Sequence, residues 1–340
     1  MKKMVILLVT LLALVACTSP VDLVVLHAGS LAVPYAYMAQ EFEEANPGVT
    51  VVTESAGSRT TIRKVTEMDK PGDVIGSADY VAIEELMFPD YADWYICFAT
   101  NEMVIAYTEQ SKYHDEINEN NWYEILLRED VTYGHSDPDA DPCGYRTLMM
   151  VQLAQSYYYD EAGDFGLTPD ANASDLYDAL IPIPEGSTEM DRGRTGGDWG
   201  EVVRPKSVEL LYLLDSGDLD YAFEYRSVAV QHEYDFVSLP EEIDLSSMEY
   251  EEFYATATVK VTGKEPGTTA TQTGATIVYG VTIPSNAPHP DLAIDFLELM
   301  LGPQGQAILE DCGQPPIVPA IASHPMELPE ELREFVLTPF

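Results

Sequence analysis

Basic residues are scarce in this chain: 17 Lys and Arg stand against 58 Asp and Glu, which leaves a formal net charge of −41 at pH 7. The acidic residues are spread along the whole sequence rather than gathered in one tail. A surface of one negative sign argues against nucleic acid and an anionic bilayer as partners. Because 46% of the residues are apolar, the chain is still expected to fold, and 340 residues are enough for two lobes.

Cysteine is also rare, with four residues in the chain. The three beyond Cys17 are far apart and form no CxxC pair, so neither a zinc site nor a disulfide framework is expected. The six histidines lack metal-ligand spacing. No GxSxG elbow surrounds Ser30 or Ser58, and the Gly-rich stretch "DRGRTGGD" lacks the lysine of a P-loop. These absences argue against the common hydrolase and nucleotide-binding chemistries.

One long hydrophobic run opens the sequence. Two lysines precede an apolar stretch that ends at Cys17, a pattern typical of a signal peptide over residues 1–16. A small residue directly before Cys17 resembles a lipobox, which predicts lipid on that thiol and a membrane-anchored tether over residues 17–21. Simple secretion with an incidental cysteine is the alternative. Either way, the mature protein is expected to work outside the cytoplasm.

Beyond the leader, apolar strand-like runs alternate with segments of helical spacing, which predicts an α/β fold with a mostly parallel sheet. Two successive predicted strands end in the same phrase, Ala-Gly-Ser, at residues 28–30 and 56–58. In open α/β sheets ligands lie beyond the carboxyl ends of the strands, where glycine allows close approach and helix N-termini favour anions. Helix capping alone is the alternative for each serine. The pair indicates half of a cage for a small dianion.

A second group of candidate ligands lies further along the chain. In "DPCGYR", Asp141 is expected to cap a helix through the Cys143 and Gly144 amides, with Pro142 at the first helical position. The amides of this helix start are then available to an anion. Tyr225, in "FEYRS" at the end of a predicted strand, is either a wall residue of the cleft or a hydroxyl donor.

The stretches "HAGSL", "AGSRTTIRKV", "DPCGYR", "SGDLDYAFEYRSVAVQH" and "VYGVTIPSNA" together resemble the archaeal tungstate/molybdate-binding proteins, the solute receptors of ABC importers. The resemblance covers most of the mature chain. It implies a two-lobed fold of the type II periplasmic-binding-protein kind, with lobe 1 over residues 22–103 and 229–340, lobe 2 over 104–228, and the ligand cleft between them. It further implies a receptor without catalysis or cofactor, whose partner is the permease subunit.

The resemblance also assigns roles to individual positions. Ser30, Ser58 and Tyr225 become hydroxyl donors, Asp141 faces the oxyanion and Cys143 offers its backbone N–H. Leu31, Pro142, Ser207 and Glu209 are further candidates at the same turns.

In that family an Asp and a Glu can ligate the metal of the oxyanion, which makes its coordination octahedral. Asp141 matches the first carboxylate. The position of the second falls on Ser207, and Glu209 lies two residues further on. Either Glu209 reaches the ion, or the ion stays tetrahedral with Ser207 as another donor.

The expected chemistry leaves several cargoes to compare. Tungstate and molybdate are fully deprotonated at neutral pH, so a cage of donors suits them as it suits sulfate, whereas hydrogen phosphate needs an acceptor. Receptors for phosphate, sulfate or ferric iron are therefore the alternatives within the same class. The alternative from another class is a secreted serine hydrolase, with Ser30 or Ser58 as nucleophile and His27 or Asp141 beside it.

Overall fold

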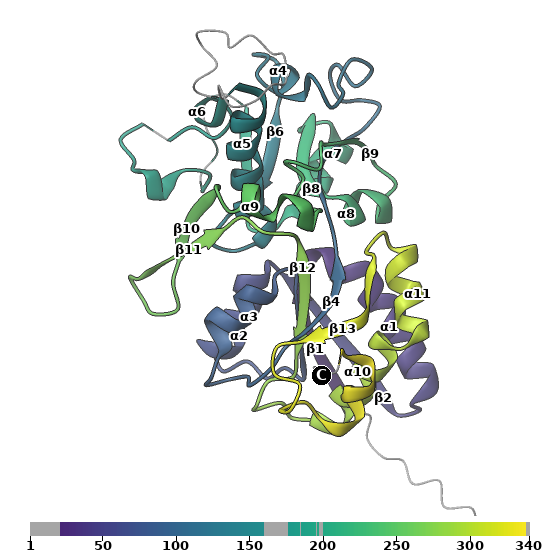
Figure 1. The fold of residues 1–340 in the computed structure, drawn as a ribbon. Helices are drawn as coiled ribbons and strands as arrows, with labels where there is room; N and C mark the ends of the chain where they lie inside the picture. The colour runs from purple at the N-terminus through teal and green to yellow at the C-terminus, as the bar shows by residue number, and fades with distance from the viewer. Residues whose placement is uncertain (1–20, 160–175, 184, 195, 197–199, 338–340) are drawn as a thin grey trace, which may run out of the picture.

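The computed structural model describes residues 21–159, 176–183, 185–194, 196 and 200–337. The predicted signal peptide, Cys17 and the tether before Val21 lie outside these residues. The chain forms two lobes, each built on its own sheet, and Figure 1 shows one above the other. The predicted two-lobed α/β fold is confirmed. Within the described ranges, no helix has both the length and the apolar character needed to cross a bilayer.

Lobe 1, the lower lobe of Figure 1, is a mixed six-stranded sheet covered by helices on both faces. The prediction of a mostly parallel sheet is wrong here: β1 pairs in parallel with β2 and β3, but the pairs formed by β12 and β13 are antiparallel. Its strands, in spatial order, are β13 (Pro316–Ala322), β4 (Ile96–Thr100), β12 (Val278–Thr282), β3 (Val74–Ser77), β1 (Val21–Ala28) and β2 (Val49–Ala56). Its helices are α1 (Ala32–Ala45), α2 (Ser58–Thr66), α3 (Tyr80–Met87), α10 (Pro290–Leu301) and α11 (Pro303–Asp311), with the short η1 (Gly29–Leu31) and η6 (Glu330–Phe335). Two apolar clusters fill this lobe. Phe42 and Phe296 belong to one, and Ile62 and Ile83 of α2 and α3 belong to the other.

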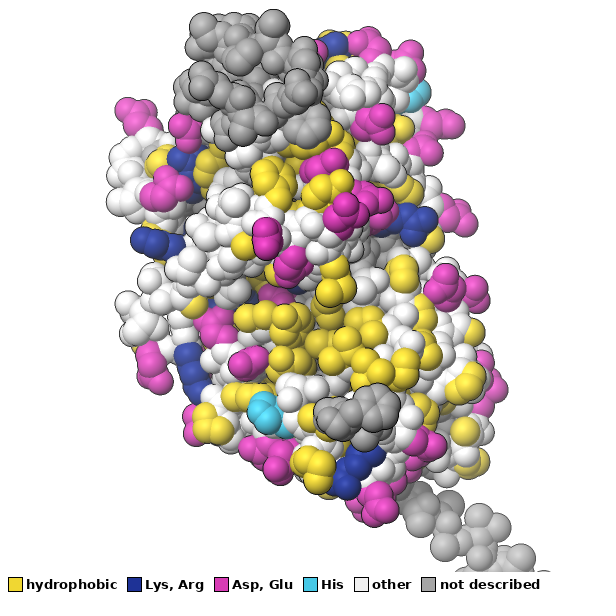
Figure 2. Space-filling view, in the orientation of Figure 1, with side chains coloured by type: hydrophobic (Ala, Val, Ile, Leu, Met, Phe, Trp, Pro, Cys, Tyr) yellow, Lys and Arg dark blue, Asp and Glu magenta, His cyan; other side chains and the backbone are white. Residues whose placement is uncertain are grey.

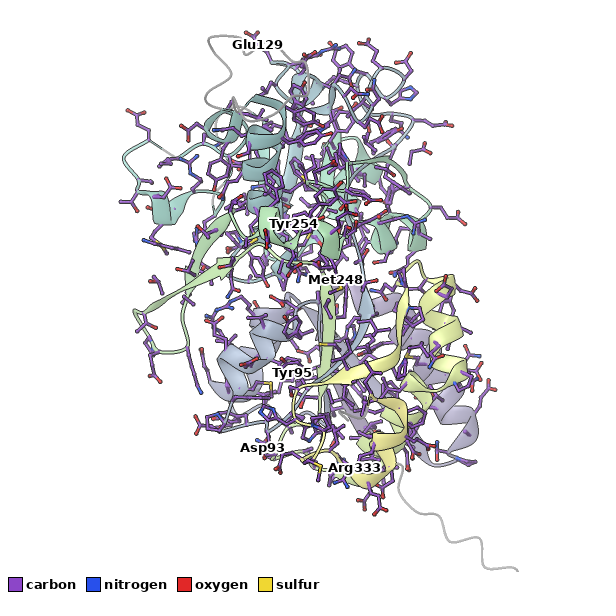
Figure 3. All side chains as sticks on the ribbon, viewed as in Figure 1. Asp93, Tyr95, Glu129, Met248, Tyr254 and Arg333 are labelled. Atoms are coloured by element: carbon purple, nitrogen blue, oxygen red, sulfur yellow. The ribbon has the colours of Figure 1, made fainter. Side chains whose placement is uncertain are left out.

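Lobe 2 is a five-stranded sheet around which helices pack. Its strands, in spatial order, are β7 (Glu201–Arg204), β6 (Tyr133–Ser136), β8 (Tyr221–Tyr225), β5 (Met103–Tyr107) and β9 (Asp235–Ser238). Its helices are α4 (Trp122–Leu126), α5 (Pro142–Tyr159), α6 (Leu176–Leu180), α7 (Leu211–Ser216) and α8 (Arg226–Gln231), with η3 (Glu189–Asp191) and η4 (Ser207–Glu209). Side chains fill the interior of both lobes (Figure 3), and Trp122 packs edge-on against Phe223 at the centre of lobe 2.

The chain enters lobe 2 between β4 and β5 and returns through a long connection that ends at β12. We expected the return at residue 229, but β9 pairs with β5, so the chain stays in the sheet of lobe 2 through Ser238. The connection contains η5 (Met248–Tyr250), α9 (Glu251–Tyr254) and the hairpin of β10 (Thr258–Thr262) and β11 (Thr269–Thr273). Tyr254, labelled in Figure 3, is fully buried at this connection.

The hairpin of β10 and β11 bridges the two lobes. The carbonyl oxygen of Thr262 accepts hydrogen bonds from Arg59 and Arg63 of α2 in lobe 1, at 2.6 and 3.0 Å. The amide of the same residue donates to Asp139 of lobe 2 at 2.7 Å. Acidic side chains are scattered over the visible face of both lobes and outnumber the basic ones there, while hydrophobic side chains gather in the middle of lobe 1 (Figure 2).

The register of the first two strands decides where the candidate ligands lie. β1 and β2 are parallel neighbours, and Ala28 is paired with Ala56. Because each alanine is followed by Gly-Ser, the two turns leave the sheet side by side at the same edge. β3 pairs with β1 on its other side, with His27 opposite Gly76, so the loop after β3 reaches the same edge.

Candidate functional site

The two serines of lobe 1 are buried at the boundary with lobe 2, and neither acts as a helix N-cap. Ser58 is the first residue of α2, and its Oγ accepts a hydrogen bond from the Ala78 amide at 2.9 Å. Ser30 Oγ accepts from the Tyr279 hydroxyl at 2.9 Å, and that hydroxyl accepts from Asn101 Nδ2 at 3.0 Å. A hydroxyl whose oxygen already accepts an N–H or O–H keeps its own proton available for another partner.

Backbone amides add to these hydroxyls. The first N–H groups of a helix have no intrahelical acceptor, which applies to Ser58 and Arg59 at the start of α2. The Leu31 side chain is part of the apolar core, so this candidate can serve a ligand only through its backbone. Amides and hydroxyls therefore converge on one edge of lobe 1.

The side chain of Asp141 caps the helix start in lobe 2 through one of the two predicted amides, since the Gly144 amide donates to the Asp141 backbone carbonyl instead. Asp141 Oδ1 accepts from the Cys143 amide at 3.3 Å, and Pro142 is the first residue of α5. Asp141 Oδ2 accepts from the Ser207 amide at 2.9 Å, so this carboxyl ties α5 to η4. We expected the Cys143 N–H to face the anion, but in this structure it belongs to the cap. Burial raises the pKa of Asp141 to about 6, although the amides of Ser207 and Cys143 favour its charged form.

Tyr225 ends β8 and is buried at the boundary between the lobes. Its hydroxyl oxygen accepts a hydrogen bond from Arg146 Nη1 at 2.8 Å. In the part of the chain that the structure describes, the phenol proton has no acceptor. The tyrosine is therefore oriented as a donor, in the same way as the two serines.

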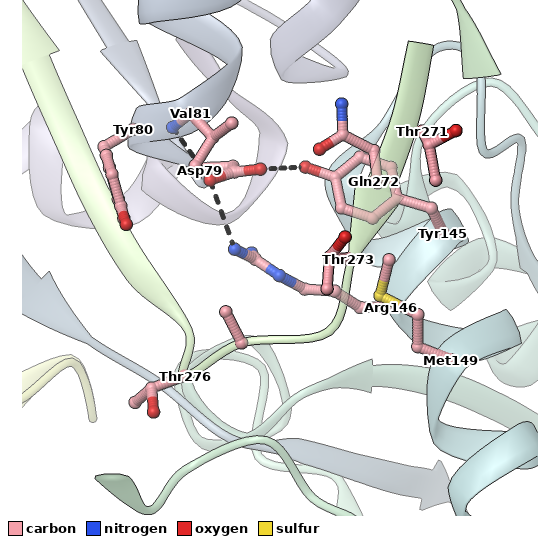
Figure 4. A pocket seen from close by; sticks show the side chains of 11 residues that line it. Asp79, Tyr80, Val81, Tyr145, Arg146, Met149, Thr271, Gln272, Thr273 and Thr276 are labelled. Atoms are coloured by element: carbon pink, nitrogen blue, oxygen red, sulfur yellow. Dashed lines mark hydrogen bonds and ion pairs between the residues drawn. The ribbon is translucent and has the colours of Figure 1, made fainter. Parts of the chain in front are cut away.

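Sequence reasoning missed the ionic partners of this site. Arg146 lies in "DPCGYR" but was given no role, and its Nη1 also donates to the Ala78 carbonyl of lobe 1 at 2.6 Å. Its Nη2 lies 3.6 Å from Asp79 Oδ1, and the Tyr145 hydroxyl donates to Asp79 Oδ2. Figure 4 shows Arg146 and Tyr145 pointing from lobe 2 toward Asp79. They line a pocket of about 200 Å³ together with Gln272 and neighbouring threonines of the hairpin. The position of Arg146 in "DPCGYR", next to the predicted site, was the signal in the sequence that could have identified this partner.

A second buried carboxyl, also missed, lies beside Asp141. Glu224 Oε2 accepts from the Tyr225 amide at 2.8 Å and lies 3.9 Å from Cys143 Sγ. Burial raises the pKa of Glu224 to about 8, so this group is mostly protonated at neutral pH. Glu209, by contrast, is only half-buried in η4, while Ser207 is buried against Asp141.

Several buried polar atoms here lack a hydrogen-bond partner. Among the described residues these include Glu224 Oε1 and Ser136 Oγ from lobe 2 and Gln314 Oε1 from lobe 1. Gln314 Nε2 donates to the Ser30 carbonyl at 3.2 Å, which places it next to the first turn. Ser136 also interacts with Asp141, and Gln314 with Tyr279. Buried polar side chains from both lobes therefore lie near the boundary, where a polar ligand would find partners.

The lobes are closed on each other at this site. The Thr60 amide of α2 donates to the Ala140 carbonyl of lobe 2 at 3.3 Å. A Cβ on Gly57 would lie 2.2 Å from that carbonyl oxygen and 2.9 Å from Asp141 Cβ. The first turn has a looser contact, since a Cβ on Gly29 would meet the Val208 side chain at 3.0 Å. Glycine is thus required at Gly57 by the approach of the other lobe.

The arrangement does not fit a serine hydrolase. His27 Nδ1 bonds to the Ala28 carbonyl at 2.7 Å, and burial lowers the pKa of this ring to about 4. Both oxygens of Asp141 accept backbone amides. Within the described ranges, neither Ser30 nor Ser58 therefore has a base oriented to take its proton.

Comparison with known proteins agrees with this picture. The family model described as "Bacterial extracellular solute-binding protein" matches residues 23–313. A solute-binding protein of Petrotoga mobilis is 50% identical over 93% of this chain and 90% of its own length. The molybdate/tungstate-binding protein WtpA of Pyrococcus abyssi is 39% identical over 92% of this chain and 89% of its own.

Among solved structures, the periplasmic molybdate-binding protein of Azotobacter vinelandii shares the fold. It has a TM-score of 0.57 and 16% identity, and the match covers 86% of this chain and 98% of that one. The sulfate-binding protein SubI of Mycobacterium tuberculosis aligns with a TM-score of 0.56 and 14% identity, over 87% of each chain.

Proposed function

Because this chain belongs to the family of bacterial extracellular solute-binding proteins, we propose that it captures molybdate or tungstate outside the cytoplasm and delivers it to an ABC permease. The family and the similar proteins named above bind solutes, and the protein is a receptor rather than an enzyme. The identity of the solute is the proposal, supported by the 39% identical molybdate/tungstate-binding relative and by the chemistry of the cage.

The proposal rests on the hydrogen-bond direction of three hydroxyl groups, whose oxygen atoms each accept a hydrogen bond from the protein. The oxygen of Ser58 accepts from a backbone amide, that of Ser30 from Tyr279, and that of Tyr225 from Arg146. Each is left to donate its proton, and they come from both lobes. Hydroxyl donors from both lobes favour an oxyanion that carries no proton of its own. Hydrogen phosphate would direct its proton at another donor, which leaves a buried polar hydrogen unpaired.

The two buried carboxyls fit this interpretation. Glu224 is mostly uncharged at neutral pH because burial raises its pKa, so it adds little repulsion to a dianion. Asp141 is held by two amides, which partly offset its charge. Donors from neutral groups contribute about 1 kcal/mol each, and roughly 1.5–3 kcal/mol when the partner is charged. Six such bonds to a dianion sum to about 9–18 kcal/mol, and values near the upper end reach nanomolar affinity, about −12 kcal/mol, after the cost of closing the lobes.

We propose that the anion stays tetrahedral in this protein. Ser207 occupies the place that the resemblance assigns to a second carboxylate, and it is buried against Asp141. Glu209 is two residues further along η4 and half-buried. X-ray absorption at the molybdenum edge tests this. Four short Mo–O distances are expected, and two additional longer ones would show that carboxylates ligate the metal.

Calorimetric titration of the purified mature protein with molybdate, tungstate, sulfate and phosphate tests the cargo. Tight binding of molybdate and tungstate is expected, with much weaker binding of phosphate. Preference for phosphate would refute the donor cage, and preference for sulfate would keep the cage but refute the cargo.

Anchoring and delivery form a separate part of the proposal. The expected lipid on Cys17 would hold the receptor at the outer face of the membrane, beside its permease. A Cys17→Ser variant expressed in cells should move from the membrane fraction to the medium or periplasm. Uptake of radiolabelled molybdate by cells that carry the permease, with and without this receptor, tests delivery.

A further inference from the structure

Arg146 contacts both lobes through a single nitrogen. It lies in the second turn of α5 in lobe 2 and is 5% exposed. Nη1 donates to Tyr225 of its own lobe and to the Ala78 carbonyl of lobe 1. Nη2 lies near Asp79 of the same lobe 1 loop (Figure 4). A buried guanidinium stays charged and only donates, so each of these contacts fixes which partner accepts.

The contact with Tyr225 fixes the direction of the phenol. With the guanidinium as donor, the phenol oxygen is the acceptor and its proton is directed elsewhere. Without this donor, the phenol could rotate its proton onto a neighbour and present its oxygen to the cage. A hydroxyl in that state accepts a hydrogen bond from a protonated ligand rather than donating one.

The contact with Ala78 acts on the other lobe. Ala78 lies between β3 and α3, and its amide is the donor to Ser58 Oγ. By holding the carbonyl of the same residue, Arg146 helps to keep that loop, and hence its amide, against Ser58. The loop and the arginine belong to different lobes, so this arrangement exists only when the lobes are closed.

We propose that Arg146 is a positioning residue that couples closure of the lobes to the donor polarity of the cage. It thereby sets the preference for fully ionised over protonated oxyanions. This inference rests on the proposed function. The proposed role includes the orientation of the Tyr225 hydroxyl in addition to the ion pair with Asp79. The ion pair alone would change the affinity for all anions alike.

The test compares Arg146→Lys with Arg63→Lys. A lysine ammonium cannot reproduce the planar fork, so it cannot keep the contacts with Tyr225, Ala78 and Asp79 in place together. Arg63 is the matched control. It also crosses the boundary, donating to the Asp139 carbonyl at 3.2 Å, but it contacts none of the three hydroxyls. Affinities for molybdate and phosphate are measured for each variant by calorimetry, after circular dichroism has shown that the variant is folded.

Arg146→Lys should lower the ratio of molybdate to phosphate affinity at least about tenfold. Arg63→Lys should weaken both anions by similar factors and leave the ratio unchanged. In a Tyr225→Phe background the effect of Arg146→Lys on the ratio should shrink, because the two residues act on one hydroxyl. An unchanged ratio in Arg146→Lys, or an equal change in Arg63→Lys, would overturn the inference.

Two further outcomes are distinguished. If Arg146→Lys does not fold, Arg146→Gln replaces it with the same expectation and the same refuting result, because the shorter, uncharged amide cannot hold the contacts with Tyr225, Ala78 and Asp79 together. If the wild-type protein does not bind molybdate, tungstate or sulfate at all, the proposed function fails, whatever the variants show.

Discussion

Replacing Gly57 by alanine should prevent the lobes from closing without harming the fold of either lobe. The glycine has φ −60° and ψ 144°, a conformation open to any residue, so the methyl group introduces no backbone strain. In the closed structure, however, that methyl carbon would lie 2.2 Å from the Ala140 carbonyl oxygen. The methyl group would meet a backbone carbonyl, so no neighbouring side chain can rotate away to relieve the contact.

The size of the effect follows from this geometry. Overpacking of this kind costs about 1–3 kcal/mol. Moving Ala140 away also lengthens the hydrogen bond from Thr60, worth about 1 kcal/mol. Together these terms destabilise the closed form by about 2–4 kcal/mol, which weakens ligand binding roughly 30- to 1000-fold. The melting temperature without ligand should be unchanged or slightly raised, because alanine reduces the freedom of the unfolded chain.

Calorimetry with molybdate and thermal unfolding of the ligand-free protein are the two assays. Gly29→Ala is the matched control, since its methyl group would meet only a Val208 side chain at 3.0 Å, and it should weaken binding no more than a few-fold. Wild-type affinity in Gly57→Ala would refute the closure argument. A large drop in its melting temperature would show that the residue serves the fold instead.

Three further measurements test other parts of the site. The Ser30→Ala, Ser58→Ala double variant should lose at least a hundredfold in molybdate affinity, and its stability should fall by about 1–3 kcal/mol for each lost acceptor, because the Ala78 amide and the Tyr279 hydroxyl donate to these oxygens. Retained affinity would remove both hydroxyls from the cage. Glu224 has its pKa raised by burial from about 4.5 to about 8, so the folded state holds this proton more tightly and stability falls as pH rises through that window. Glu224→Gln should therefore gain up to about 4 kcal/mol over the wild type between pH 5 and pH 8.5 in chemical unfolding, and equal pH profiles would contradict this. With a net charge of −41, association with molybdate should speed up as salt is added, and a rate that falls with salt would argue against charge repulsion.

The local parts of this molecule were predictable from the sequence. The repeated Ala-Gly-Ser phrase and the capped start of α5 depend on residues close in the chain, and turn chemistry follows from neighbours. The sequence could also place the two turns on successive strands. It could not show that Ala28 faces Ala56, because register is set by packing of the whole sheet.

The residues that orient the ligands were not predictable in the same way. Tyr279 reaches Ser30 from a strand 249 positions later, and Asn101 lies at the crossover between the lobes. Such contacts leave no periodicity or spacing in the sequence. The return of the chain into lobe 1 was misplaced for a related reason: β9 is a short edge strand whose partner, β5, lies more than a hundred residues upstream.

The pairing of β1 with β2 also bears on how such a receptor can be altered. Neighbouring strands lie about 4.8 Å apart. The spacing between the turns that carry Ser30 and Ser58 is therefore set by the pairing of β1 with β2 and not by the side chains at the turns. Redesign toward a smaller or larger anion would have to work from the opposite lobe, at Asp141, Ser207 and Tyr225. One residue inserted into β2 would shift its register, turn Ser58 away from Ser30 and leave the anion with the donors of one turn only.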